Sequence, residues 1–120
     1  MRKTILMAGL IFLLGACKEV KTEPANYILE IAMVKPIAGT SDQKMRDTMK
    51  SLDTFVKDQE GFIARDFGKA EDGYWIDVVK WKSLKAAKAA EKNAEKSSIC
   101  MKAFELFDVK SIQMRHITPQ

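Results

Sequence analysis

The sequence predicts an α+β sandwich in which four strands and two helices follow one another in the order β-α-β-β-α-β. The strand-like segments are rich in β-branched and aromatic residues and cover residues 27–34, 62–67, 74–81 and 109–117. Between them lie two stretches in which apolar residues recur with the spacing of an α-helix. A turn signal, Asp72-Gly73, joins the two central strands.

The central hairpin sets the strongest constraint on the fold. In its second strand Tyr74, Ile76 and Val78 alternate with Trp75, Val79 and Trp81, so both faces of the strand are apolar. A strand of this kind is covered on both faces. A chain of 120 residues has helices for only one face. We therefore expect a partner subunit or a ligand on the other.

The first strand and first helix have clear boundaries. The strand ends at Lys35-Pro36, where proline removes a backbone donor. Thr40 or Ser41 offers an N-cap for the helix that follows. The apolar residues of this helix share one face and are Met45, Met49, Leu52, Phe55 and Val56. We expect the helix to end near Gly61, because glycine is the usual residue after a helix C-terminus.

The second half of the chain begins with a helix that Ser83 caps and that runs from Leu84 to about Ala94. Five alanines make it a strong helix former with little bulk. Helical spacing resumes over residues 99–107 after a polar break, and the last strand follows. Together the elements give a ferredoxin-like sandwich over residues 26–118.

The N-terminal residues have the pattern of an export signal. Arg2 and Lys3 precede an apolar run, and residues 14–17, Leu-Gly-Ala-Cys, resemble the bacterial lipobox. The resemblance implies a signal peptide over residues 1–16, an acylated Cys17 that inserts into membrane lipid, and a tether over residues 17–25. Lys18 then predicts the outer membrane, facing the periplasm, if the cell is Gram-negative. The alternative is an ordinary cleaved signal with an incidental cysteine.

Charge and cysteine content narrow the function classes. Without its first sixteen residues the chain has 18 basic and 16 acidic residues, interleaved along the sequence, so we expect no nucleic-acid partner. An acylated Cys17 leaves Cys100 as a lone thiol in an oxidising compartment. A buried apolar role is expected for Cys100, and an intermolecular disulfide or a reactive thiol is the alternative.

A set of motifs spread over residues 60–116 resembles the antibiotic biosynthesis monooxygenase (ABM) domain. They are Glu60-Gly61-Phe62, residues 72–83 (Asp-Gly-Tyr-Trp-Ile-Asp-Val-Val-Lys-Trp-Lys-Ser), the alanine pairs 86–87 and 89–90, Phe104, Phe107 and His116. The resemblance implies a homodimeric α/β barrel in which two sheets meet face to face. Enzymes of this family oxidise phenols or quinols with dioxygen and no cofactor, or degrade haem.

The haem-degrading branch is excluded residue by residue. The resemblance places its catalytic tryptophan and its haem-ligating histidine at or near Ala90 and Cys100, and neither residue type is present there. We therefore expect no cofactor and no metal.

The other activity that the resemblance implies, oxidation of a phenol or quinol without a cofactor, needs a base, aromatic walls and groups that orient a substrate. His116 is the only histidine and is predicted as the catalytic base, on one strand face with Ile112 and Met114. The predicted substrate-binding residues are Trp75, Trp81, Tyr27, Asn26 and Arg65. Asp66 and Asp77 are expected to be solvated or salt-bridged.

A structural role for His116 and a core role for Trp81 are the alternatives to these assignments. Two functions therefore stay open. One is a membrane-tethered, cofactor-independent monooxygenase that acts on a phenolic or quinol small molecule. The other is a non-enzymatic lipoprotein dimer that binds a small apolar ligand or an envelope protein.

Overall fold

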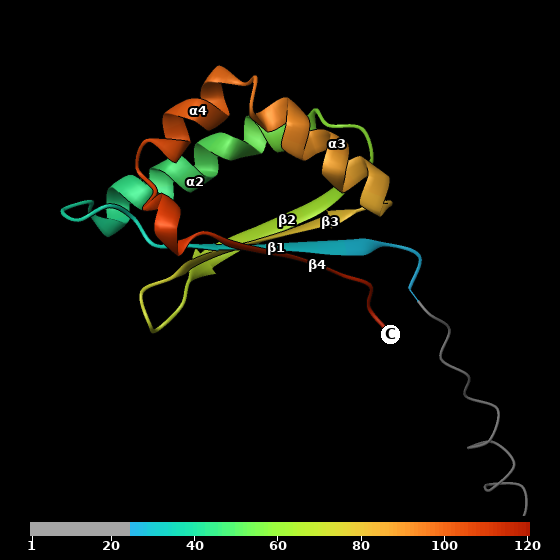
Figure 1. Cartoon of the computed structure of the whole chain (residues 1–120), viewed down its shortest axis with the longest axis horizontal. Coiled ribbons are helices and arrows are strands. Elements are labelled where there is room, and N and C mark those ends of the chain that lie inside the picture. The colour runs from blue at the N-terminus through green and yellow to red at the C-terminus, as the bar shows by residue number, and fades with distance from the viewer. Residues whose placement is uncertain (1–24) are drawn as a thin grey trace, which may run out of the picture.

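The computed structural model describes residues 25–120 and shows one sheet with helices on one of its faces (Figure 1). The predicted signal peptide, Cys17 and almost all of the predicted tether lie outside the described residues. The elements in chain order are β1 (Ile28–Val34), α2 (Asp42–Lys57), β2 (Phe62–Lys69), β3 (Trp75–Trp81), α3 (Leu84–Ala94), α4 (Ser98–Phe104), η1 (Val109–Ser111) and β4 (Gln113–Ile117).

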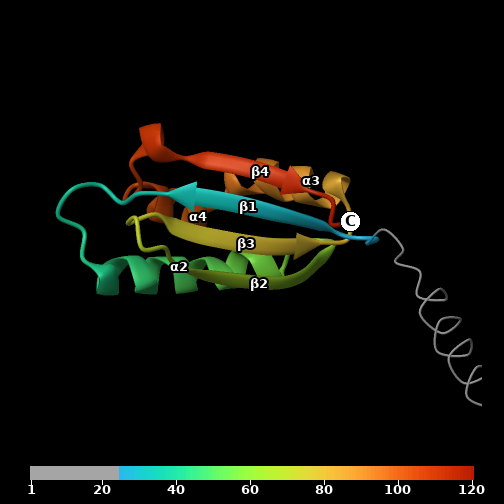
Figure 2. The same ribbon diagram turned by 90° about the horizontal axis from the view of Figure 1, so that it is seen from below.

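The described strands form one antiparallel sheet in the order β2-β3-β1-β4. This is the strand order of a ferredoxin-like sandwich, so the predicted α+β fold class is confirmed. In the register of the sheet Glu30 on β1 lies opposite Val79 on β3 and His116 on β4. Figure 2 shows the strands from the face that no helix covers.

Two hydrophobic clusters fill the space between the sheet and the helices. The first joins α2 and α4 to one end of the sheet and contains Val34, Met45, Met49, Leu52, Trp75, Cys100, Ala103 and Phe107. The second lies under α3 and contains Val56, Val79, Trp81, Ala87 and Ala90. The apolar face predicted for the first helix is therefore the face that packs, and the predicted burial of Cys100 is confirmed.

Local signals place the helix ends and the hairpin. Ser41 and Ser83 are the N-caps of α2 and α3, and each side-chain oxygen accepts a backbone N–H three residues later at 3.1 Å. The turn between β2 and β3 contains Gly73 with φ +92°. Gly61 has φ +83°, and a Cβ there would lie 2.5 Å from Cβ of Ala86, so only glycine fits between α2 and α3.

The prediction of one long last strand over residues 109–117 was wrong in its first part. Residues Val109–Ser111 form a 3₁₀ turn, and β4 begins at Gln113. The Asp108 carboxylate accepts the backbone N–H of Lys110 at 3.1 Å, and the Ser111 hydroxyl accepts the backbone N–H of Lys35 at 2.8 Å. These side-chain bonds hold the backbone in a turn although its residues favour a strand. The helix predicted over 99–107 is likewise shorter, Ser98–Phe104.

The uncovered face of the sheet has an apolar centre, with Lys80 and Arg115 on the same face beside it. Register and alternation place Leu29, Ile31 and Met33 of β1 beside Ile76 and Val78 of β3, away from the helices, and all five are only partly buried in the single chain. The expectation that helices cover one face alone is therefore confirmed. None of the described helices is long and apolar enough to span a bilayer.

Candidate functional site

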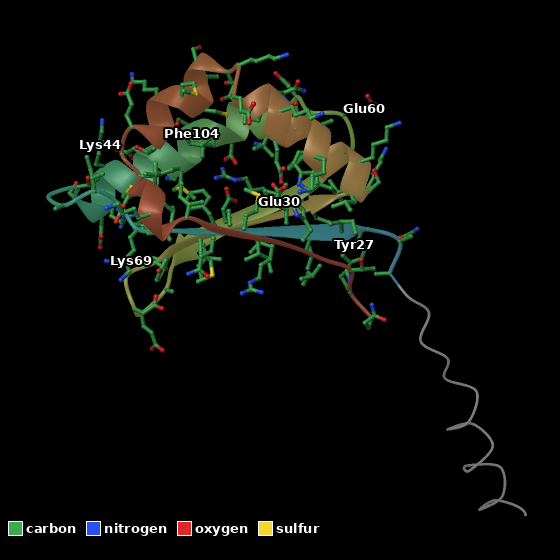
Figure 3. All side chains as sticks on the ribbon, in the orientation of Figure 1. Tyr27, Glu30, Lys44, Glu60, Lys69 and Phe104 are labelled. Carbon is green, nitrogen blue, oxygen red and sulfur yellow. The ribbon has the colours of Figure 1, made fainter. Side chains whose placement is uncertain are left out.

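The only histidine of the chain lies between two carboxylates on the helix-covered face of the sheet. Nε2 of His116 is 2.8 Å from Oε2 of Glu30, a hydrogen-bond distance, and 3.0 Å from Oε1 of Glu91. The three residues come from β4, β1 and α3. Figure 3 labels Glu30, which lies on the helix side of β1. The predicted base thus has two acidic partners inside the sandwich.

Burial sets the electrostatics of this cluster. The side chains of Glu30 and His116 are 11% and 15% exposed, whereas that of Glu91 is 29% exposed. Burial raises the pKa of the Glu30 carboxyl, the contact with His116 opposes that rise, and the neighbouring Glu91 adds to it. Glu30 therefore holds a proton more readily than an isolated glutamate does.

A second buried charge cluster lies at Arg65 on β2. Its guanidinium donates two hydrogen bonds to the Asp77 carboxylate, at 2.8 and 2.9 Å, one to Asp53 at 2.8 Å and one to the backbone carbonyl of Met49 at 2.7 Å. Burial lowers the pKa of Arg65, but the bonds to Asp77 and Asp53 outweigh it and keep the guanidinium charged. The predicted ion pairing of Asp77 is confirmed.

This arrangement fixes what Arg65 can do. Its side chain is 2% exposed, and four of its five N–H groups are bound to protein atoms. The same contacts tie β2 to β3 and to α2. Arg65 therefore holds the sandwich together, and its donors are not directed at the His116 cluster.

Both tryptophans lie in the interior. Trp75 is 3% and Trp81 is 1% exposed, and Trp81 packs edge-on against Phe62 with ring centroids 6.1 Å apart. Neither indole N–H has a hydrogen-bond partner among the described residues. A buried donor without a partner is costly, so each N–H is available to an acceptor that enters the interior.

The two remaining predicted substrate-binding residues are not brought to the cluster. Nζ of Lys80 lies 3.8 Å from the Tyr27 ring centroid, and alternation along β3 places Lys80 on the uncovered face of the sheet. Tyr27 therefore lies on the face opposite to His116, immediately before β1 (Figure 3). Asn26 is exposed beside it, at the end where the described chain begins.

Two surface hollows accompany these clusters. One lies between α2 and α4 and includes Thr48 and Ala103 in its lining, and the other lies between the α2–β2 turn and α3 and includes Gly61 and Ala89. Neither is lined by any of the six predicted site residues. In the single chain the Trp81 side chain is enclosed by protein, at 1% exposed, and the His116 side chain keeps a small exposed fraction of 15%.

The sequence-based prediction missed Glu30 and Glu91. Glu30 is the one charged residue in the apolar run over residues 27–34, and alternation places it on the same strand face as Ala32 and Val34. That position was a usable signal, because a charge on a buried face needs a partner. Glu91 carries no such signal, because the alanine-rich helix also contains several exposed charged residues.

No family model and no curated protein matches the sequence. Solved structures do match the fold. SnoaB, a cofactor-independent oxygenase from Streptomyces nogalater, superposes with a TM-score of 0.62 at 11% identity, over 80% of this chain and 95% of that chain. A Bordetella bronchiseptica protein assigned to the antibiotic biosynthesis monooxygenases gives 0.64 at 15% identity, over 80% and 99% of the two chains.

A third structure is a monooxygenase from the gene ActVA-Orf6 of Streptomyces coelicolor, solved in complex with nanaomycin D. It gives a TM-score of 0.60 at 10% identity, over 78% of this chain and 87% of that chain. At these identities the likeness defines the fold. The chain therefore has the ferredoxin-like subunit fold found in monooxygenases of the ABM type, as the sequence motifs predicted.

Proposed function

We propose that this protein is a cofactor-independent monooxygenase that oxidises a phenolic or quinol small molecule, with His116 as the proton acceptor. The observation that carries the proposal is the position of His116, half-buried between two carboxylates in a fold shared with oxygenases of that kind. A hydrogen-bonded carboxylate orients an imidazole and stabilises its protonated form. Glu30 is the residue placed to do this for His116.

The reaction needs no electron source besides the substrate. His116 takes a hydroxyl proton, and the resulting anion is electron-rich enough to react with dioxygen. One oxygen atom enters a ring carbon, the other leaves as water, and the substrate loses two hydrogen atoms. The substrate supplies all four electrons that reduce dioxygen. The unpaired indole N–H of Trp81, in the core cluster under α3, is a donor that a substrate oxygen entering the interior could accept from. Trp75 packs in the other core cluster, beside α2 and α4, so it is not placed to share that substrate.

The packing of the interior favours a second candidate function, a non-enzymatic module. Trp75 and Trp81 are almost completely buried by protein, and the two hollows lie elsewhere on the surface. In this role the domain binds a small apolar ligand or an envelope protein, and the His116 cluster is structural. Substrate entry in the first role requires side chains near Trp81 to move.

The proposed setting is the same for both functions. The uncovered face of the sheet, through its apolar centre, is the surface by which two copies would form a barrel-like homodimer, since neither face of β3 would then remain in water. Acylation at Cys17 would hold the dimer at a membrane, where quinols also partition. Ala25 donates a backbone hydrogen bond to Pro119 at 3.3 Å, so a tether before residue 25 would leave the domain beside its C-terminus.

Oxygen uptake by the metal-free protein, with a panel of hydroquinones and naphthols and with product masses recorded, tests the proposal. His116→Ala is the site variant. Glu95→Gln is the control, because Glu95 is exposed one turn beyond Glu91, at the end of the same helix. We expect oxygen uptake in the wild type and in the control, with a product that has lost two hydrogens and gained one oxygen. The rate of uptake should fall by at least about a hundredfold in His116→Ala.

An unchanged rate in His116→Ala would retain the activity and remove His116 from its mechanism. No uptake with any member of the panel, together with saturable binding of an apolar dye, would support the non-enzymatic module.

A further inference from the structure

Three potential metal ligands converge in the His116 cluster. Nε2 of His116 and one carboxylate oxygen from each of Glu30 and Glu91 lie within 4.8 Å of one another. Each comes from a different element, namely β4, β1 and α3. A site built from three elements holds its ligands in place through the whole fold, which favours a fixed coordination geometry.

The hydrogen bonds within the cluster leave one oxygen unused. Nε2 carries at most one proton, and it has hydrogen-bonding geometry toward Glu30 only. Oε1 of Glu91 is buried and has no hydrogen-bond partner among the described residues. Lys88 approaches the other oxygen, Oε2, at 3.6 Å, so it does not satisfy Oε1. The contact of Oε1 with Nε2 of His116 at 3.0 Å lacks hydrogen-bond geometry, so this buried carboxylate oxygen can still accept a positive ligand.

We propose that Glu30, Glu91 and His116 bind one divalent transition-metal ion. Two ligands that lie about 2.1 Å from a metal are roughly 3 Å apart at the right angle of octahedral coordination and roughly 3.4 Å apart at the tetrahedral angle. The separations of Nε2 from the two carboxylate oxygens, 2.8 and 3.0 Å, are close to the octahedral spacing and need to widen only slightly for the tetrahedral one. One imidazole and two carboxylates suit ions such as Zn²⁺, Mn²⁺ and Fe²⁺, whereas Ca²⁺ needs more oxygen ligands and Cu⁺ needs sulfur.

The cluster also offers a route for the ion. Glu91 is 29% exposed, so an ion can reach the cluster from the α3 side without global unfolding. A bound ion would occupy the imidazole lone pair that the proposed proton transfer needs. The metal site is therefore a property beyond the proposed oxygenase function, and its test requires no turnover.

Calorimetric titration of the chelator-treated, untagged full chain with ZnCl₂ tests the site, with the single imidazole followed by NMR. We expect one Zn²⁺ per chain and a shift of the His116 ring signals at the same stoichiometry. Glu91→Gln and His116→Gln should each weaken binding by at least about tenfold. Glu95→Gln should bind as the wild type does.

The absence of saturable binding would overturn the proposal, as would Glu91→Gln and His116→Gln variants that bind as tightly as the wild type. Glu91 is partly exposed, so its variant is expected to fold even if Glu30→Gln does not. Zinc binding without oxygen uptake would reject the proposed oxygenase and keep the metal site. Oxygen uptake without zinc binding would support the proposed oxygenase and reject the metal site.

Discussion

Replacement of Arg65 by methionine should destabilise the protein strongly. Methionine fills much of the same volume, but it leaves the Asp77 carboxylate, 16% exposed, without its two hydrogen bonds and the Met49 carbonyl without its donor. Removing one partner of a buried ion pair costs about 3–5 kcal/mol. A domain of this size has a stability of about 5–14 kcal/mol, so the loss is a large part of the total.

Urea denaturation followed by far-UV circular dichroism measures this loss. Lys69→Met is the matched control, because it removes a β2 cation whose ion pair with Asp42 is exposed, and it should cost at most about 1 kcal/mol. In Arg65→Met/Asp77→Leu both charges are absent, and more than half of the lost stability should return. A loss below about 1 kcal/mol in Arg65→Met, or a double variant no more stable than the single, would show that burial of the Arg65–Asp77 pair does not set this stability.

Three further predictions concern packing, thiol chemistry and assembly. Gly61→Ala should lower the stability by about 2 kcal/mol more than Gly39→Ala, because both glycines have positive φ but only Gly61 faces a neighbouring Cβ at 2.5 Å. Equal urea denaturation midpoints for the two variants would contradict this. In a folded Cys17→Ser variant at pH 8, Cys100 should react with a disulfide reagent at least about tenfold more slowly than in the same variant unfolded in urea, because burial raises the pKa of its thiol and excludes the reagent. Equal rates would show that the thiol is accessible in the folded protein. Val78→Lys should convert the proposed dimer to a folded monomer in sedimentation experiments, whereas Ile37→Lys, in an exposed loop, should leave the dimer intact. A dimeric Val78→Lys variant would exclude the uncovered sheet face as the interface.

The features of the fold that the sequence predicted depend on local patterns. Ser41 and Ser83 cap their helices through backbone groups three residues away, and Asp72-Gly73 makes the hairpin turn by its own conformational preference. The start of the last strand was missed because Ser111 accepts a hydrogen bond from Lys35, a residue 76 positions earlier. Such a contact exists only once the fold has formed.

For the candidate site, too, the sequence predicted one part and missed the partners that only the fold brings together. His116 was predictable, because it is the only side chain with a near-neutral reference pKa. Its partnership with Glu30 depends on the register between β1 and β4, across 86 positions of sequence, and its contact with Glu91 depends on how α3 lies over the sheet. Neither follows from spacing along the chain. The predicted role of Arg65 in orienting a substrate is not supported by its contacts, which are all with the protein.

Glu30 and Glu91 hold the single histidine inside the sandwich. The most direct measurement is long-range ¹H–¹⁵N NMR of the imidazole in the metal-free protein, since one histidine gives one set of ring signals. We predict a ring N–H that exchanges slowly with water and signals that shift in both Glu30→Gln and Glu91→Gln, but not in Glu95→Gln. A freely exchanging imidazole with the same signals in all three variants would contradict the claim.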